Sequence, residues 1–190
     1  MNGDPGDRDR LQWACLLHDI GKLAVPAHIL SKAGRPDDEE WAILKRHPAV
    51  GGEIVDSLAP WLGEWGRAAS EHHERWDGKG YPRALAGEQI SLAGRIVAVA
   101  DAYDVITSTR SYKKPMSAEA ARRELVRCAG TQFDPTVVRA FLNVSLGRRG
   151  AHAGMLGWLS KKIYGGAEAS TSASATSASS RGRKGTSDCA

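Results

Sequence analysis

The sequence predicts an all-α fold. Apolar residues recur at intervals of three or four along the chain up to about Leu146, which places them on one face of a helix. Residues that commonly cap helices stand at the starts of several of these segments. No stretch of five or more residues alternates between apolar and polar side chains as a half-buried strand would. The 190 residues therefore have room for one helical domain with its own core.

The first two helices are expected between residues 9 and 47. One covers residues 9–20, and Gly21 is expected to end it. After a loop, Asp37 and Glu40 have the spacing of a capping box, so a second helix is expected to begin there. The buried side of this second helix is expected to carry two apolar residues, Trp41 and Leu44.

Two further helices are expected on either side of Pro60. His47 comes directly before a proline, and such a residue is pushed out of the helical conformation, so His47 marks a helix boundary. The next helix is expected to end at Pro60, and its apolar residues at spacing four are Val50, Ile54 and Leu58. A single helix is then expected over residues 61–73, with His72 and His73 at its end.

Caps also mark the helices of the second half. A glycine-rich surface loop, WDGKGYPRALAGEQ, comes first, because its glycines and proline disfavour regular structure. Ser91 then opens the longest apolar helix, which is expected to be central to the core. Ser117 begins the next helix, which closes at Gly130. Asp134 starts the last helix, which reaches about Leu146.

The charge of the chain is concentrated in its C-terminal part. The net charge is +4, and from Gly147 onward there are seven Lys and Arg against two Asp and Glu. That part is rich in Ser, Thr and Ala, and its few large apolar side chains cannot offset the entropy of ordering it. We therefore expect a folded domain over residues 8–146 and a disordered basic tail over residues 147–190. Since the basicity belongs to the tail, no nucleic acid is expected as a partner.

Neither a membrane span nor a secretory signal is evident in the sequence. No apolar run approaches the roughly eighteen residues that a spanning helix needs. The first ten residues, MNGDPGDRDR, have no apolar stretch of the kind that a signal peptide contains. A cytoplasmic protein without a membrane partner is therefore expected.

Histidines and aspartates make up the candidate site. Four of the six histidines fall at ends or boundaries of expected helices, where bundle helices can converge: His18, His47, His72 and His73. Asp19 follows one of them directly. Asp101 stands among small and apolar residues, where a buried carboxylate needs a charged partner or a metal. Imidazoles and carboxylates without a thiolate suit Fe, Mn or Zn at more than one metal centre.

Several longer motifs occur in a fixed order along the chain. These are LLHDIGKLAVPAHIL, KRHPAVGGEI, EHHERWDGKGYP, VAVADAYDVITSTRSYKK and GTQFDPTVV. Together they resemble the HD-GYP family of the HD metal-dependent phosphohydrolase superfamily, over about residues 11–146. The resemblance implies an HD-domain helical bundle with two or three divalent metal ions, often iron. It also implies hydrolysis of the bacterial second messenger cyclic di-GMP to linear pGpG, or onward to GMP.

The resemblance also assigns roles to individual residues. It implies six metal ligands: His18, Asp19, His47, His72, His73 and Asp101. Among these, Asp19 is the bridging carboxylate, and Lys22 stands beside the metals near the bridging water or the phosphate. Arg110 and Lys113 are implied to hold phosphate oxygens. Tyr81 belongs to the signature loop that lies over the pocket and can also face a partner domain, such as a diguanylate cyclase domain.

One departure from the family concerns the start of the chain. Family members carry a further metal-binding His on a helix well before the HD pair, whereas no His occurs among the residues before His18. We therefore expect the N-terminal helix or helices to be missing and the first metal to have a weaker set of ligands. Oligomeric state stays open, with a homodimer as one option.

Two other functions remain as alternatives to the enzyme. One is a catalytically impaired signalling module that binds cyclic di-GMP, or a diguanylate cyclase domain, without turnover. The other is an HD phosphohydrolase that acts on a different nucleotide, which the GYP loop disfavours.

Overall fold

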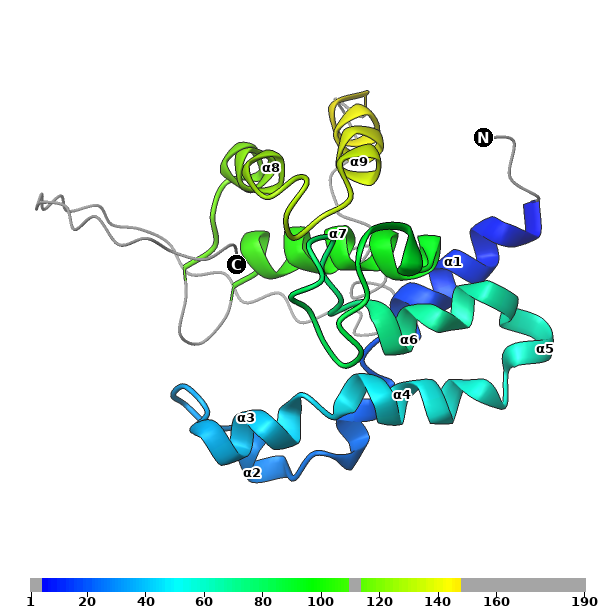
Figure 1. The fold of residues 1–190 in the computed structure, drawn as a ribbon. Helices are drawn as coiled ribbons and strands as arrows, with labels where there is room; N and C mark the ends of the chain where they lie inside the picture. Colours follow the sequence, from blue (N-terminus) through cyan, green and yellow to red (C-terminus); the bar gives the residue numbers. More distant parts are fainter. Residues whose placement is uncertain (1–4, 110–113, 148–190) are drawn as a thin grey trace, which may run out of the picture.

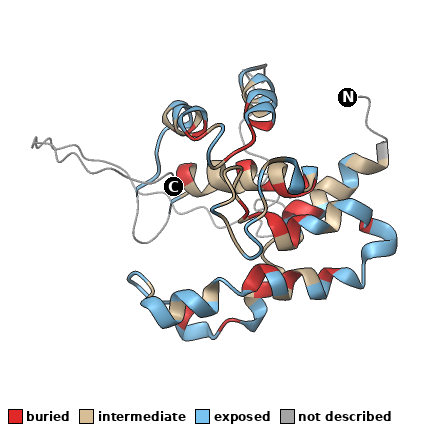
Figure 2. Cartoon of the chain, in the orientation of Figure 1, coloured by how far each residue is buried: buried red, intermediate tan, exposed pale blue. Residues whose placement is uncertain are grey.

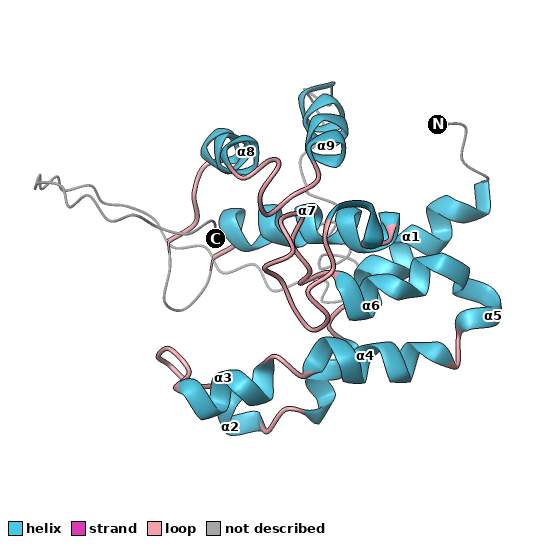
Figure 3. Cartoon of the chain, viewed as in Figure 1, coloured by secondary structure: helices cyan, strands magenta, loops and turns pink. Residues whose placement is uncertain are grey.

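The computed structural model describes residues 5–109 and 114–147, and every regular element in these ranges is helical (Figures 1 and 3). The first half contains α1 (Pro5–Leu17), η1 (Ile20–Ala24), α2 (Ala27–Leu30), α3 (Asp38–Leu44), α4 (His47–Asp56) and α5 (Ala59–Leu62). The second half contains η2 (Gly63–Arg67), α6 (Ala68–Glu71), η3 (Gly87–Gln89), α7 (Leu92–Thr107), α8 (Ala118–Arg127) and α9 (Pro135–Gly147). The prediction of an all-α fold is confirmed for these residues.

The first helix ends earlier than the sequence pattern predicts. The helix α1 stops at Leu17, and Gly21 lies inside the short helix η1 instead of ending α1. Gly21 is buried against α4, and a Cβ atom there would lie 1.9 Å from the backbone oxygen of His47. The glycine therefore serves the close approach of η1 to α4, a tertiary requirement that the helix-stop pattern does not reveal.

The capping box at the start of α3 is confirmed. The Asp37 carboxylate accepts a hydrogen bond from the Glu40 amide at 3.0 Å, and the Glu40 carboxylate accepts one from the Asp37 amide at 2.8 Å. The expected burial of Trp41 and Leu44 is wrong, because α3 has no buried residue and Trp41 is 45% exposed. This helix lies with α2 at the edge of the molecule, away from the core (Figure 2).

The stretch expected as one helix over residues 61–73 is divided into three. It contains the end of α5, then η2, then α6, and Gly63, the first residue of η2, has a φ of 54°. Pro60 lies in the first turn of α5, where a proline needs no amide hydrogen bond, and α4 has already ended at Asp56. His72 and His73 follow α6 directly, as expected from the sequence.

The long helix α7 connects two parts of the core. Its N-terminus is capped by Ser91, whose hydroxyl accepts a hydrogen bond from the Gly94 amide. Val97 packs in a buried cluster with residues of α1 and α6, whereas Val99 packs with residues of α8 and α9. Burying such a side chain is worth about 1.5–3 kcal/mol. Packing on both sides therefore fixes α7, and with it Asp101, against the rest of the domain.

Within the described ranges, no helix has the length and apolar character that crossing a membrane requires. The tail expected over residues 147–190 lies, apart from Gly147, outside the described residues. Its disorder and the domain boundary at 146 stay predictions.

Candidate metal centre

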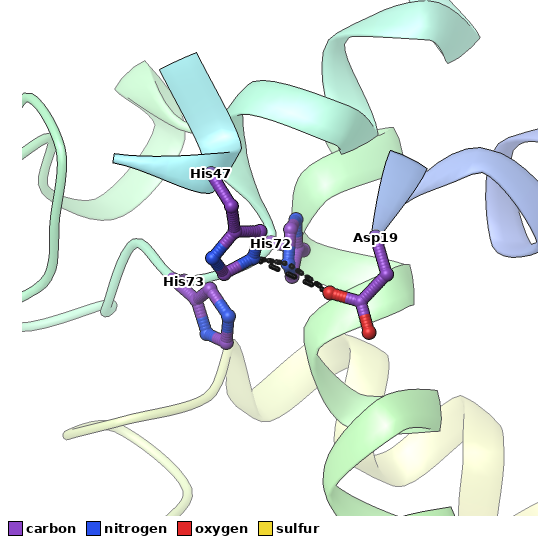
Figure 4. Close-up of side chains that lie close together, drawn as sticks. All are labelled: Asp19, His47, His72 and His73. Atoms are coloured by element: carbon purple, nitrogen blue, oxygen red, sulfur yellow. Dashed lines mark hydrogen bonds and ion pairs between the residues drawn. The ribbon is translucent and has the colours of Figure 1, made fainter. Parts of the chain in front are cut away.

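The Asp19 carboxylate faces three histidines, one at the start of α4 and two that follow α6 (Figure 4). Its Oδ1 atom is 3.3 Å from Nε2 of His47 and 3.7 Å from Nε2 of His72. These three residues and His73 each offer one ligand atom, and the four atoms lie within 4.8 Å of one another. The group therefore has the size of a single metal-binding site.

The other carboxylate oxygen of Asp19 faces a second set of residues. Its Oδ2 atom is 3.4 Å from Nε2 of His18, and that nitrogen is also 3.8 Å from Oδ1 of Asp101. Lys22 donates a hydrogen bond of 2.6 Å to the same Oδ2 atom. The two oxygens of one carboxylate thus point to two groups of potential ligands, which is the arrangement that a bridging carboxylate requires.

Backbone carbonyls orient three of the imidazole rings. The Nδ1 atoms of His18, His47 and His72 lie 2.7, 2.7 and 2.9 Å from the carbonyl oxygens of Cys15, Leu44 and Ala68. Because a carbonyl can only accept, Nδ1 carries the hydrogen in each ring, and Nε2 of the neutral ring is left with a lone pair. Metal-binding histidines are oriented in this way in many proteins.

The lone pairs of imidazole nitrogens and of the Asp19 carboxylate therefore point toward one another, with no hydrogen atom between them. The Nε2 atoms of His47 and His72 are 3.4 Å apart, and both face Oδ1 of Asp19. That oxygen is buried and has no hydrogen-bond partner among the described residues. An unpaired buried carboxylate oxygen is costly, and a cation among these atoms would satisfy all three. The residues present thus fit a divalent metal ion.

Burial and neighbouring charges set the protonation of the group. Burial lowers the pKa of His73 to about 2, helped by the nearby His72 and His47 rings, and burial also lowers the pKa of His72. For His18, burial is outweighed by the contacts with Asp19 and Asp101, so its pKa is raised. Burial likewise opposes ionisation of Asp19, but its contact with His18 lowers its pKa overall. His72 and His73 are therefore neutral at pH 7 and the carboxylate is charged, as metal ligation requires.

The glycine-rich loop is tied to the chain next to His73. The Tyr81 amide donates to the His73 carbonyl at 3.2 Å, and the two side-chain rings stack with centroids 4.8 Å apart. A Cβ atom on Gly80 would lie 2.4 Å from the Arg75 amide nitrogen, so only glycine allows this approach. The buried Glu74 carboxylate accepts hydrogen bonds from two loop amides farther along. The loop thus brings Tyr81 to the edge of the histidine group.

All six residues expected as metal ligands come together in the structure. Four form the compact group around Oδ1, and His18 and Asp101 join it on the side of Oδ2. Lys22 and Tyr81 also lie beside it, as expected. The expected phosphate-binding residues Arg110 and Lys113 lie outside the described residues.

Two residues near the group were missed by the sequence reasoning. Trp41, expected in the core, has its ring 6.5 Å from that of Tyr81, and the Lys45 ammonium lies 5.5 and 5.7 Å from the two ring centroids. Trp41 and Lys45 are four residues apart on one helical face, a spacing that was visible in the sequence. Nothing in the sequence indicated that this face meets the glycine-rich loop.

The helical fold thus brings together a histidine and aspartate group of the kind that can bind metal ions. A family model described as HD domain matches residues 1–137, and the chain belongs to this family, in its HD-GYP branch. The fold is also similar to the crystal structure of a cyclic GMP-AMP-specific phosphodiesterase of Vibrio cholerae. That similarity has a TM-score of 0.58 at 18% identity and covers 86% of this chain and 44% of that chain.

Curated relatives are similar over the same region. A cyclic di-GMP phosphodiesterase of Thermotoga maritima is 45% identical over 135 residues, which are 70% of this chain and 37% of the relative. A cyclic di-GMP phosphodiesterase of Pseudomonas aeruginosa is 47% identical over 129 residues, covering 68% and 31%. A 3'3'-cGAMP-specific phosphodiesterase of Vibrio cholerae is 42% identical over 137 residues, covering 72% and 26%. The chain thus spans between 26% and 37% of the length of these relatives.

Proposed function

We propose that this chain hydrolyses a phosphodiester bond of a cyclic dinucleotide, with cyclic di-GMP as its main substrate. The observation that carries this proposal is the pair of ligand groups on the two oxygens of Asp19, one with three histidines and one with His18 and Asp101. The names of the curated relatives, which are cyclic di-GMP or cGAMP phosphodiesterases, support the substrate class.

The six ligands would hold two or three divalent ions, with Fe or Mn favoured by the mixed nitrogen and oxygen donors and Zn also compatible. Asp19 would be shared between ions, and Asp101 would add a second carboxylate on the side of His18. When bound, such ions lower the pKa of water and neutralise charge on phosphate oxygens. The protein supplies the neutral Nε2 atoms and the ionised carboxylates that make this binding possible.

The positively charged side chains would hold the anionic substrate. Lys22 lies 2.6 Å from Oδ2 of Asp19, so its ammonium is within reach of a phosphate placed over the centre. We propose that Arg110 and Lys113 add charge-assisted hydrogen bonds to phosphate oxygens that do not react. Tyr81, stacked on His73, would bound the pocket on the side of the loop.

The reaction adds water across one P–O3′ bond of the ring. The hydroxyl joins phosphorus, the proton goes to the 3′ oxygen, and the product is linear pGpG. A second hydrolysis would give GMP. The loop around Tyr81 could in addition bind a diguanylate cyclase domain, and a homodimer is compatible with the proposal.

The proposal is tested with Asp19→Ala and a matched exposed variant, Asp56→Ala. The metal content of each protein is measured by elemental analysis, and the products of incubation with cyclic di-GMP are separated by chromatography. We expect wild type and Asp56→Ala to bind metal and form pGpG, and Asp19→Ala to lose both. A chelator should abolish turnover in the first two proteins.

Other results would contradict the proposal. Normal metal content and rate in Asp19→Ala would refute the bridging role. Retention of cyclic di-GMP by metal-loaded wild type without any product would instead support a binding module that has lost turnover. Indifference to cyclic di-GMP, with hydrolysis of another nucleotide, would support an HD phosphohydrolase of different specificity.

A further inference from the structure

Next to the histidine group lies a cluster that the proposed hydrolysis does not use, formed by Trp41, Tyr81 and Lys45. The two rings meet edge to face, with centroids 6.5 Å apart and an angle of 73° between their planes. The Lys45 ammonium lies 5.5 Å from the Trp41 centroid and 5.7 Å from the Tyr81 centroid. We call this arrangement the aromatic corner.

The aromatic corner is continuous with the metal-binding group. Tyr81 stacks on His73 at 4.8 Å with an angle of 22°, so the corner begins one ring away from a proposed ligand. The three side chains come from two segments, because Trp41 and Lys45 belong to the α3 region and Tyr81 to the glycine-rich loop. A phosphate held at the proposed metal site would therefore have an aromatic surface beside it.

Burial does not explain the position of Trp41. The side chain is 45% exposed and belongs to a helix without buried residues, so it contributes little to the core. An exposed aromatic ring next to a phosphate-binding centre is suited to stacking with a nucleobase, an interaction that tolerates any base because each has a π-face. Lys45 adds an ammonium group, whose hydrogen bonds can distinguish one base from another.

We propose that the aromatic corner binds one base of the cyclic dinucleotide and selects guanine through Lys45. The base stacks on one of the two rings and turns its edge to the other, so that the Lys45 ammonium, which lies over both rings, meets the base edge. An ammonium only donates hydrogen bonds, and guanine offers two adjacent acceptors, O6 and N7, whereas adenine offers N7 beside an amino donor. This inference rests on the proposed function and adds the determinant of its base specificity.

The chain offers a matched control for Trp41. Trp61 is 46% exposed and also meets an aromatic ring edge to face, with its centroid 5.8 Å from that of Trp13. It belongs to α5 and takes no part in the aromatic corner. Trp61→Ala therefore removes an equally exposed tryptophan without touching the proposed base site.

The experiment measures equilibrium binding and turnover of cyclic di-GMP, 3'3'-cGAMP and cyclic di-AMP by the metal-loaded full chain. Trp41→Ala should weaken binding of cyclic di-GMP and raise its KM about five- to a hundredfold, because stacking contributes about 1–3 kcal/mol per base. Its kcat should change little. Trp41→Leu, which keeps apolar bulk but has no π-face, should show the same loss, and Trp61→Ala should match wild type.

Lys45 is tested by base preference instead of by affinity alone. Wild type should prefer cyclic di-GMP and 3'3'-cGAMP, each of which can place a guanine in the corner, over cyclic di-AMP. Lys45→Met should reduce this preference by about tenfold, the scale of one base-edge contact, and Lys45→Arg should retain it. Metal content should be unchanged in all these variants.

The outcomes separate this inference from the proposed function. Wild-type affinity for cyclic di-GMP in both Trp41 variants, or an unchanged base preference in Lys45→Met, would overturn the inference while leaving hydrolysis intact. If wild type binds cyclic di-GMP without hydrolysing it, the proposed function fails, and the binding measurements still decide on the corner. If wild type bound none of the three dinucleotides, both this inference and the proposed function would be overturned.

Discussion

Replacing Gly21 by alanine is expected to damage the protein at the contact that holds the metal-binding group together. Gly21 belongs to η1, two residues after Asp19, and it packs directly against α4, which begins at His47. A Cβ atom at this position would lie 1.9 Å from the His47 carbonyl oxygen and 2.6 Å from the Gly51 amide nitrogen. Both atoms belong to backbone, so no side-chain rotation relieves the clash.

The size of the effect follows from the displacement required. The contact of 1.9 Å must open beyond 3.0 Å, so η1 and α4 must move apart by more than an ångström. Overpacking of this kind costs about 1–3 kcal/mol, and backbone contacts favour the upper end. Alanine also lowers the conformational entropy of the unfolded chain, which offsets about 0.4–1 kcal/mol of this destabilisation. A net loss of about 2 kcal/mol lowers the Tm by about 4–8 °C in a domain of this size.

The same movement separates Asp19 from His47, whose ligand atoms are 3.3 Å apart. Metal affinity falls about ten- to hundredfold when groups that orient metal ligands are altered, and we expect a loss of that order. Thermal unfolding followed by circular dichroism and competition with a metal-binding dye measure the two effects. Gly34→Ala is the control, because a Cβ atom there meets nothing within 4 Å. Wild-type Tm and metal affinity in Gly21→Ala would refute this reasoning.

Two other side chains give further predictions. Burial raises the pKa of Cys15 to about 11, above its ordinary value of 9.0, so the stabilisation from the protonated thiol is complete below pH 9 and declines as the pH rises to 11. Peptide mass spectrometry should therefore detect little alkylation of Cys15 at pH 8 in the native protein and rapid alkylation in urea. Glu74→Ala should destabilise the glycine-rich loop by about 1–3 kcal/mol, because the amides of Arg83 and Leu85 lose their carboxylate acceptor. Limited trypsin digestion should cut this loop faster than in Glu53→Ala, an exposed control, and equal rates would contradict the assigned role of Glu74.

The residues of the candidate site were foreseen better than the helices that carry them. His72 and His73 were placed correctly at a helix end although the helix over residues 61–73 is really three short elements. The order of the motifs does not depend on the exact course of the backbone between them. The wrong helix boundaries therefore do not change which residues are the candidate ligands. The prediction for Gly21 is wrong for the opposite reason. A glycine after a helical pattern looks the same in the sequence whether it ends a helix or allows a neighbouring helix to approach closely.

The apolar residues of α3 led to a wrong prediction of burial for a related reason. Trp41 and Leu44 share a helical face, and such a face is usually buried. In the structure Trp41 lies beside Tyr81 and Lys45, at the rim of the candidate site. For a large aromatic residue, the pattern of hydrophobicity alone cannot distinguish a place in the core from a place on a binding surface.

Local signals were enough to place three of the helix starts. Ser91, Ser117 and the capping pair before Trp41 were read correctly because each hydrogen bond joins atoms within three residues of one another. The division of ligands between the two oxygens of Asp19, and the meeting of α3 with the glycine-rich loop, depend on contacts between segments tens of residues apart. Such contacts arise from the packing of whole elements, and a one-dimensional pattern carries no record of which faces will meet.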